Sequence, residues 1–158
     1  MKNTEEAFKW IVGLLQENKI PFQLSGGFAA KMHGSDRPLY DIDIEIPDSY
    51  FDNLRPLVKN YIVYGPQRYL DETFDLLLMT LKFEEQKIDI SGCENDKLYN
   101  YITNQWESCE TNLNNAVRKE FYSLTIPVIK WQDLVEYKKK IRRPTDLEDI
   151  KAILQKNS

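Results

Sequence analysis

The strongest constraint on the fold of this chain is a six-residue run in which acidic residues alternate strictly with isoleucines, Asp41-Ile42-Asp43-Ile44-Glu45-Ile46. Successive side chains of a β-strand point to opposite faces, so this period of two predicts a half-buried strand with the isoleucines in the core. Asp41 and Asp43 then leave from the other face, with about 6–7 Å between their Cα atoms. A slip of one residue would bury the acids, which fixes the register of the strand.

A third acid follows the same design, because Asp89 lies between two isoleucines in a later strand-like run. An acid on a strand often belongs to the solvated face, and that interpretation stays open, although Asp is disfavoured in strands. Carboxylates that share one face repel each other unless a cation lies between them, and Mg²⁺ prefers oxygen ligands. We therefore predict that Asp41, Asp43 and Asp89 form a Mg²⁺ site, and three carboxylates can hold two metal ions about 3.5–4 Å apart.

A glycine pair precedes the acidic strand, in the run Ser25-Gly26-Gly27. Paired glycines between a strand and a helix let backbone N–H groups approach a phosphate, and the N-terminus of the helix adds favourable partial charge. A glycine pair is more often a simple turn, and that alternative also stays open. The position of the pair, 14 residues before Asp41, places it at the expected end of a neighbouring strand.

The rest of the pattern predicts one α/β (α+β) domain over residues 1–158, with a small mixed β-sheet flanked by helices. Residues 4–19 have the spacing of an amphipathic helix, and Asn3 and Glu6 have the offset of a capping box. The segment 93–120 shows no clear pattern. The other expected elements are a strand at 22–24, a helix at 28–33, a helix from Asp48 to Asn60, a hairpin of strands at 74–83 and 87–90, an edge strand at 126–129, and two closing helices at 131–141 and 145–155, the second capped by Thr145 and Glu148.

Composition excludes several classes of protein. The chain of 158 residues carries a net charge of −4, which argues against broad nucleic-acid binding, since that requires a basic face. Its longest apolar run is too short to span a bilayer, and the N-terminus lacks the pattern of a signal peptide, so a cytoplasmic location without membrane attachment is expected. Cys93, Cys109 and the single His33 lack the spacing of a zinc site.

Together these pieces resemble the nucleotidyltransferase superfamily with the DNA polymerase beta-like catalytic fold. Its minimal signature is a Gly-Gly or Gly-Ser turn, an Asp-x-Asp strand and a later Asp. The sequence is most similar to the branch that contains the lincosamide, aminoglycoside and abortive-infection-type nucleotidyltransferases. Members of this branch often carry His-Gly followed by Arg-x-Thr-x-Asp-x-Asp. His33-Gly34 and the run from Arg37 to Asp43 fit this pattern, except that Leu39 replaces the usual Thr.

The C-terminal part resembles the same branch, in which a Leu and a Lys on one helix precede Arg-Pro-x-Asp and a further acid. The matching residues are Leu134, Lys138, Arg143-Pro144, Asp146 and Asp149. We expect the helices over 131–156 to close the site, with Lys138 facing a triphosphate and the other basic residues near it solvated at a helix end. Arg143 and Asp146 can equally form a structural pair that locks the two helices.

The resemblance implies an enzyme that transfers a nucleoside monophosphate from a nucleoside triphosphate to a hydroxyl of a small molecule or macromolecule and releases pyrophosphate. It implies Mg²⁺ as cofactor, with a two-metal site, and ATP or another triphosphate as substrate. The catalytic and metal-binding residues are then Asp41, Asp43 and Asp89, the last of which completes the second metal site or accepts the proton of the attacking hydroxyl. The expected nucleotide-binding residues are Ser25, Gly26, Gly27, Arg37 and Lys138.

Other interpretations stay open. A non-catalytic, antitoxin-like protein of this fold would act through a protein partner, and the Leu39 substitution favours this alternative. A glycosyltransferase or nuclease can use the same Asp-x-Asp chemistry, but the glycine turn and the C-terminal match argue against both. His33 is either a helix cap or a neighbour of the nucleotide. The aromatic residues that form either core or a stacking wall for a base or acceptor are Tyr61, Tyr64, Tyr69 and Phe74.

Overall fold

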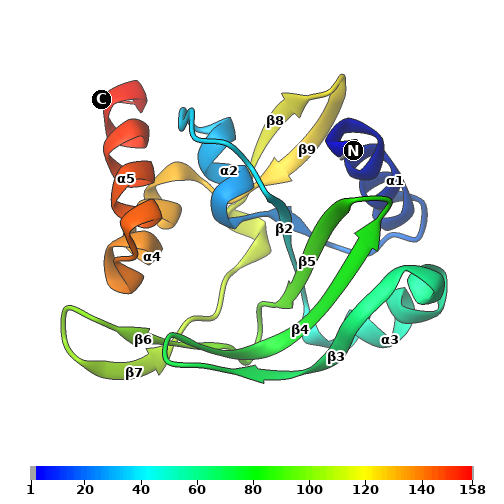
Figure 1. The fold of residues 1–158 in the computed structure, drawn as a ribbon, viewed down its shortest axis with the longest axis horizontal. Coiled ribbons are helices and arrows are strands. Elements are labelled where there is room, and N and C mark those ends of the chain that lie inside the picture. Colours follow the sequence, from blue (N-terminus) through cyan, green and yellow to red (C-terminus); the bar gives the residue numbers. More distant parts are fainter. Residues whose placement is uncertain (1–2, 158) are drawn as a thin grey trace.

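The computed structural model describes residues 3–157, in which one mixed sheet of nine strands carries five α-helices (Figure 1). The helices are α1 (Thr4–Glu17), α2 (Gly26–Met32), α3 (Phe51–Leu54), α4 (Trp131–Ile141) and α5 (Pro144–Asn157). The strands are β1 (Gln23–Leu24), β2 (Asp41–Ile46), β3 (Ile62–Leu70), β4 (Phe74–Phe83), β5 (Gln86–Gly92), β6 (Lys97–Asn100), β7 (Gln105–Ser108), β8 (Val117–Phe121) and β9 (Leu124–Val128). The predicted α+β class with a mixed sheet is confirmed.

The strands follow the order β7-β6-β4-β5-β2-β1-β9-β8, with β3 paired to β4. The acidic strand β2 therefore lies inside the sheet, antiparallel to β1 and parallel to β5. Its isoleucines are fully buried and its acids are half-buried, as the alternation predicts. The expected hairpin is also present, since β4 and β5 pair in antiparallel register.

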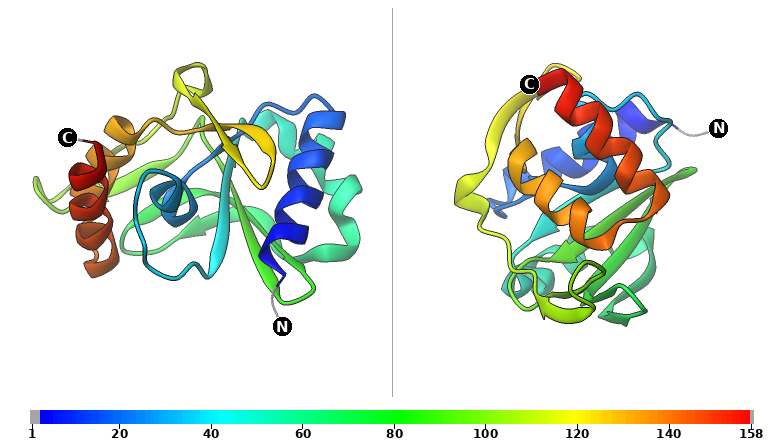
Figure 2. Two further views of the ribbon diagram at one scale, coloured as in Figure 1. Left: turned by 90° about the horizontal axis from the view of Figure 1, so that it is seen from above. Right: turned by 90° about the vertical axis from the view of Figure 1, so that its left-hand side faces the viewer.

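The core fills the space between the sheet and α1. Phe8, Ile11 and Leu15 of α1 are completely buried, which is the amphipathic face expected from the sequence. The predicted capping box is present, because Glu6 N donates to Asn3 Oδ1 over 3.0 Å and Asn3 Nδ2 donates to Glu6 Oε2 over 2.8 Å. Figure 2 shows α4 and α5 packed together at the end of the molecule opposite α1. No helix within residues 3–157 is long and apolar enough to cross a membrane.

The structure differs from the expected elements at several places. The helix predicted from Asp48 to Asn60 is broken into the 3₁₀ turn η1 (Asp48–Tyr50), the short α3 and the 3₁₀ turn η2 (Arg55–Tyr61), where Pro56 near the start of η2 cannot donate a backbone hydrogen bond. The segment without a clear pattern forms β6, β7, the 3₁₀ turn η3 (Leu113–Asn115) and β8, whose pairing depends on distant partners.

The strand predicted at 126–129 is present as β9, but its predicted position at an edge is wrong, because β9 lies between β1 and β8. Its proline is tolerated there since β9 pairs with β1 only at Val128, one residue beyond Pro127. The cap of the last helix also differs. Helix α5 begins at Pro144, so Thr145 lies inside its first turn, and Asp146 Oδ2 instead accepts from Arg143 N over 3.0 Å. A proline at the first helical position loses no hydrogen bond.

Candidate active site

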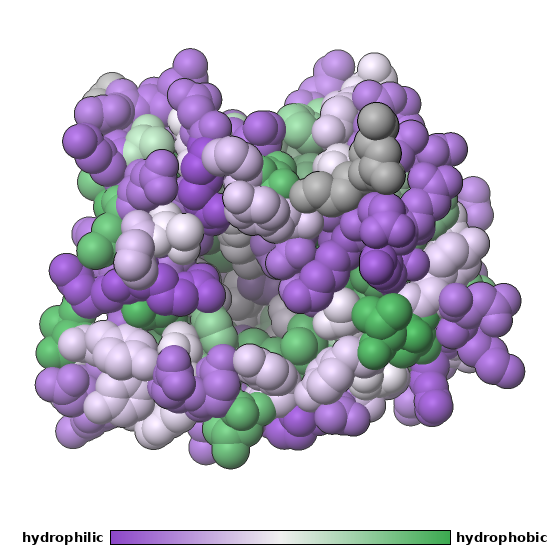
Figure 3. Space-filling model, viewed as in Figure 1, coloured by the Kyte–Doolittle hydropathy of each residue, from purple (hydrophilic) through white to green (hydrophobic). Residues whose placement is uncertain are grey.

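A cavity of about 990 Å³ opens between the sheet and α4, and Figure 3 shows this face hollowed near its centre. Its walls come from β2, β4, β5, α4 and the turn Ser25–Gly27, which is the N-cap and the first two residues of α2, since this helix begins two residues earlier than the sequence predicted. The acids Asp41, Asp43 and Asp89 all line it, together with the turn Ser25–Gly27. The structure therefore brings the three predicted acids and the predicted glycine turn to one cavity, although the cavity is formed by segments far apart in the sequence.

The sheet register explains why the acids meet. Asp43 and Asp89 are directly opposite each other on the parallel strands β2 and β5, so their side chains leave from the same face. Burial, and then the charges of Asp89 and Asp41, raise the pKa of Asp43 to about 7. A carboxyl group with such a pKa lacks sufficient positive charge around it. Perturbed groups of this kind concentrate at functional sites.

Two other contacts hold the cluster. Thr80 Oγ1 donates to Asp89 Oδ1 over 2.7 Å. The half-exposed Lys87 places Nζ 3.8 Å from Asp89 Oδ2 and 4.0 Å from Asp41 Oδ2, which are long ion pairs in contact with solvent. The position of Lys87 beside the acids follows from the β2–β5 register, in which Lys87 is directly opposite Asp41. The sequence analysis did not select this residue.

The donor set fits Mg²⁺ in its chemistry. All three predicted ligands supply carboxylate oxygens, the donors that Mg²⁺ prefers, and the raised pKa of Asp43 indicates a deficit of positive charge at that position. In the residues described, however, no group of three or more His, Cys, Asp or Glu side chains is already arranged to hold a metal ion.

Both glycines of the turn are needed for close approach. Gly26 has a φ of +56°, and a Cβ added to it would lie 2.6 Å from Asp43 Oδ2. A Cβ on Gly27 would lie 2.7 Å from Arg37 Nη2. Gly27 N donates to Asp43 Oδ2 over 3.1 Å, so the turn lies directly against the carboxylate of the acidic strand. A glycine pair at this place lets the backbone reach the group that the cavity exposes.

Lys138, predicted to face a triphosphate, is 1% exposed and lies against two completely buried acids. Its Nζ is 2.9 Å from Asp146 Oδ1 and 3.1 Å from Asp149 Oδ2. Arg37 donates to Asp149 through Nε over 2.7 Å and through Nη2 over 2.9 Å. Arg143 Nε donates to Asp146 Oδ2 over 2.7 Å, the structural pair that the sequence left open. These five residues form what we call the ionic network.

The ionic network has electrostatics opposite to those of the acid cluster. Burial opposes ionisation of Asp146 and Asp149, yet hydrogen bonds from Arg143 to Asp146 and from Arg37 to Asp149, with the charge of Lys138, keep both pKa values below the usual value. The direct hydrogen bonds of Arg37 and Lys138 are thus made to carboxylates. Both side chains nevertheless line the cavity, and the charge of Lys138 lowers the pKa of Asp43.

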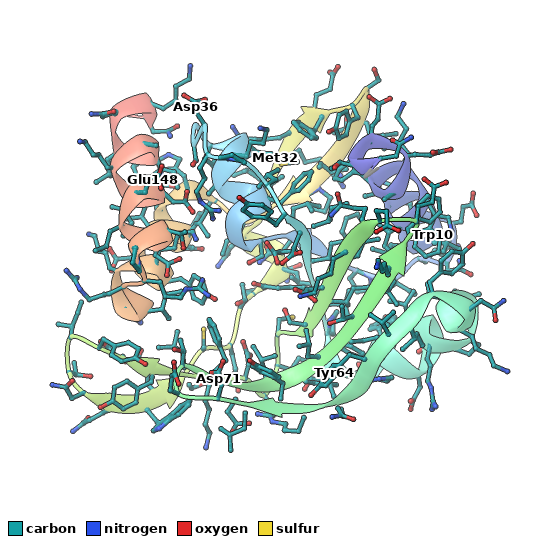
Figure 4. The ribbon with its side chains drawn as sticks, viewed as in Figure 1. Trp10, Met32, Asp36, Tyr64, Asp71 and Glu148 are labelled. Atoms are coloured by element: carbon teal, nitrogen blue, oxygen red, sulfur yellow. The ribbon has the colours of Figure 1, made fainter. Side chains whose placement is uncertain are left out.

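The remaining residues considered from the sequence fall into two groups. Tyr64, Tyr69 and Phe74 line the cavity, whereas Tyr61 packs on Trp10, at the end of the molecule far from Glu148 of α5 (Figure 4). His33 is buried and does not line the cavity. Its Nε2 lies 2.7 Å from the backbone oxygen of Ile129.

Besides Lys87, an acidic residue of the cavity was missed by the sequence analysis. Glu45, the third acid of the alternating run, lines the cavity and accepts a hydrogen bond from Ser25 Oγ over 2.6 Å. Its place on the same face as Asp41 and Asp43 was the available signal.

No protein-family model matches the sequence, and no curated protein sequence matches it. The structure is nevertheless similar to those of known proteins. A proposed nucleotidyltransferase from Thermotoga maritima, TM1012, superposes with a TM-score of 0.67 at 15% identity over 95% of this chain and 94% of the other. The lincosamide antibiotic adenylyltransferase LnuA, solved with lincomycin bound, gives 0.63 at 17% identity over 98% and 97%. ANT(2″)-Ia in complex with adenylyl-2″-tobramycin gives 0.64 at 12% identity over 98% and 89%.

These similarities extend over almost the whole length of each chain, so the chain has the nucleotidyltransferase fold that the sequence motifs indicated. At identities of 12–17% the similarity establishes the fold, and the activity has to be argued from the site.

Proposed function

We propose that the protein is a Mg²⁺-dependent nucleotidyltransferase that transfers a nucleoside monophosphate from a nucleoside triphosphate to an acceptor hydroxyl. The observation that carries the proposal is the acid cluster of Asp41, Asp43 and Asp89, which faces the glycine turn in one cavity and in which burial and the neighbouring acids raise the pKa of Asp43 to about 7. The fold shared with two adenylyltransferases supports the same reaction and favours ATP as the nucleotide.

The charge of the cavity supports a requirement for metal ions. Its lining contains eight acidic and six basic residues, and five of these bases already form ion pairs with carboxylates: Arg37, Lys87, Lys138, Lys140 and Arg143. A polyanionic triphosphate would be repelled by such a cavity without added cations. Mg²⁺ held by Asp41, Asp43 and Asp89 would neutralise the phosphates and stabilise the attacking and leaving oxygens.

The chain supplies the other requirements of the reaction. The acceptor oxygen forms a bond to the α-phosphorus, the bond from that phosphorus to the pyrophosphate oxygen breaks, and the hydroxyl proton passes to Asp89 or to water. The turn Ser25–Gly27 would lie against the phosphates, and Arg37 and Lys138 would add positive charge at that wall. Tyr64, Tyr69 and Phe74 offer an aromatic surface to the base or the acceptor.

The molecules bound to two similar structures favour a small-molecule acceptor, since LnuA was solved with lincomycin and ANT(2″)-Ia with adenylyl-2″-tobramycin. We therefore propose a small hydroxylated molecule before a macromolecule, and a reaction in the cytoplasm. The alternative is a non-catalytic protein of this fold that acts through a protein partner, and it rests on Leu39, which lines the cavity where related motifs carry Thr.

A binding assay tests the proposal before the acceptor is known. Each of the four ribonucleoside triphosphates, at millimolar concentration with Mg²⁺, is added to the protein and the melting temperature is measured. We expect at least one to raise it, because a ligand of the folded state stabilises by mass action. EDTA and Asp43→Asn should both abolish the shift. Pyrophosphate release with panels of hydroxylated small molecules, tRNA and proteins then identifies the acceptor. The absence of any shift would contradict the proposal and favour the non-catalytic alternative.

A further inference from the structure

Glu45 differs from the other acids of β2 in what its carboxylate contacts. Ser25 Oγ donates to Glu45 Oε1 over 2.6 Å, and Gln23 Nε2 donates to Glu45 Oε2 over 3.0 Å. Gln23 is directly opposite Glu45 across the antiparallel β1–β2 pair, and Ser25 lies two residues further along at the start of the turn. The Glu45 carboxylate therefore connects β2 both to β1, through Gln23, and to the N-cap of α2, through Ser25.

These contacts determine what Ser25 can offer to a ligand. A hydroxyl has a single proton, and that of Ser25 is donated to Glu45. The amide of Gln23 likewise acts as a donor to the same carboxylate. Ser25 can therefore accept a hydrogen bond in the cavity, but it cannot donate to a phosphate while its bond to Glu45 is intact.

The same contacts set the distance between the turn and the acid cluster. Ser25 N donates to Asp43 O over 2.9 Å, and Gly27 N donates to Asp43 Oδ2 over 3.1 Å. The Ser25 side chain adds the third attachment of the turn to β2, through Glu45. Without it, the turn would be held by backbone contacts to Asp43 alone, and Asp43 is the residue proposed to bind metal.

We propose that Glu45 is a positioning residue for the triphosphate: it holds the Ser25 hydroxyl and so fixes the glycine turn against Asp43. This inference rests on the proposed function, since the turn is positioned for a nucleotide. It removes the Ser25 hydroxyl from the set of phosphate donors and gives it the task of holding the turn.

Electrostatics and positioning predict opposite signs for the loss of Glu45, which makes the inference testable. Removal of a negative charge beside an anion site should tighten the binding of a triphosphate by simple charge repulsion. Loss of a positioning contact should weaken it. The readout is the dissociation constant of a non-hydrolysable ATP analogue with Mg²⁺, measured by calorimetry on the full-length protein without any acceptor.

We expect Glu45→Ala to weaken binding of the analogue about tenfold, the effect of losing one hydrogen bond to a charged group. Glu45→Gln removes the charge but keeps an acceptor for Ser25, and it should restore the dissociation constant to within about twofold of the wild type. Ser25→Ala should weaken binding as Glu45→Ala does, and the double variant should be no weaker than either single variant. Ser91→Ala, on the strand beside Glu45, makes the same change in the same wall and should leave the constant unchanged.

Gln23→Met keeps the test decisive if Glu45→Ala does not fold. Gln23 is 1% exposed and does not line the cavity, so it cannot contact the analogue. Loss of its bond to Glu45 should still weaken binding by about threefold. Unchanged or tighter binding of the analogue by Glu45→Ala overturns the inference. If Glu45→Ala does not fold, unchanged or tighter binding by Gln23→Met overturns it. A wild-type protein that binds no Mg²⁺–triphosphate overturns both proposals, whereas wild-type binding with insensitive variants overturns only the role of Glu45.

Discussion

Two groups of aspartates differ in the charges around them: one lines the cavity, and the other is buried behind the basic side chains of Arg37, Lys138 and Arg143 that line it. On the sheet, burial and then the charges of Asp89 and Asp41 raise the pKa of Asp43 to about 7. Between α4 and α5, Asp146 and Asp149 are completely buried, yet Lys138 and two arginines keep their pKa values low. The more deeply buried acids therefore have the lower pKa values, so the sign of the neighbouring charges decides the direction of the shift.

The difference separates a structural role from a binding role. The ionic network has its partners within the chain, because every carboxylate in it faces a cation at hydrogen-bonding distance. It ties the loop that carries Arg37 to the C-terminal helices and so closes one wall of the cavity. In the acid cluster the ion pairs made by Lys87 are long and in contact with solvent, and the raised pKa of Asp43 fits the proposed binding of a cation with the substrate.

The largest effect should come from breaking the ionic network. Asp149→Ala leaves Arg37 and the buried Lys138 without a shared partner, and we expect a loss of roughly 3–5 kcal/mol in the free energy of unfolding, measured in urea. Lys139→Ala is the control, because Lys139 is exposed on the same helix and its loss should change the free energy by less than about 0.5 kcal/mol. A loss below about 1 kcal/mol in Asp149→Ala would show that the network is not structural.

Loss of a carboxylate charge from the acid cluster should affect stability in the opposite direction. In EDTA, Asp43→Asn removes one of three repelling charges at nearly constant volume, so we expect it to be as stable as the wild type or more stable by about 0.5–2 kcal/mol. Asp146→Asn, the matched change in the network, should be destabilised. Thermal unfolding of both variants measures the contrast. If Asp43→Asn unfolds many degrees earlier than the wild type, Asp43 is a structural residue.

A smaller effect should appear in the pH dependence of stability. A carboxyl group whose folded pKa is raised contributes stability that is present below its unfolded pKa and is lost as the pH rises through the folded value. For Asp43 that window runs from its ordinary pKa of 3.8 up to about 7. Without metal, the wild type should therefore gain about 1 kcal/mol relative to Asp43→Asn between pH 8 and pH 6. Parallel curves for the two proteins would mean that the pKa of Asp43 is not raised, and saturating Mg²⁺ with a triphosphate should flatten the wild-type curve.

Local patterns in the sequence predicted the parts of the site that local physics determines. The isoleucine alternation fixed the face of Asp41 and Asp43, and the β4–β5 hairpin placed Asp89 on a strand. What could not be predicted depends on residues far apart in the chain. Arg37 and Asp149 are 112 residues apart, so their pairing follows from the packing of α5 against the loop, and no periodicity in the sequence reports it.

The segment between β5 and β9 shows the same limit. Its strands are short and polar, and β8 is exposed along most of its length, so they lack the alternation that marks β2. Glu45 was overlooked for a related reason: its spacing is that of its two neighbours, and only the contacts with Ser25 and Gln23 distinguish it.

Binding of Mn²⁺, a spectroscopic substitute for Mg²⁺, tests the central claim most directly. Electron paramagnetic resonance counts the bound ions with and without the non-hydrolysable ATP analogue, in the wild type and in Asp43→Asn. We expect about two ions per chain in the wild-type complex with the analogue, as in a two-metal site, and a large loss of affinity in Asp43→Asn. Failure of the wild type to bind Mn²⁺ with the analogue, or equal binding by Asp43→Asn, would contradict the assignment of the acid cluster as the metal site.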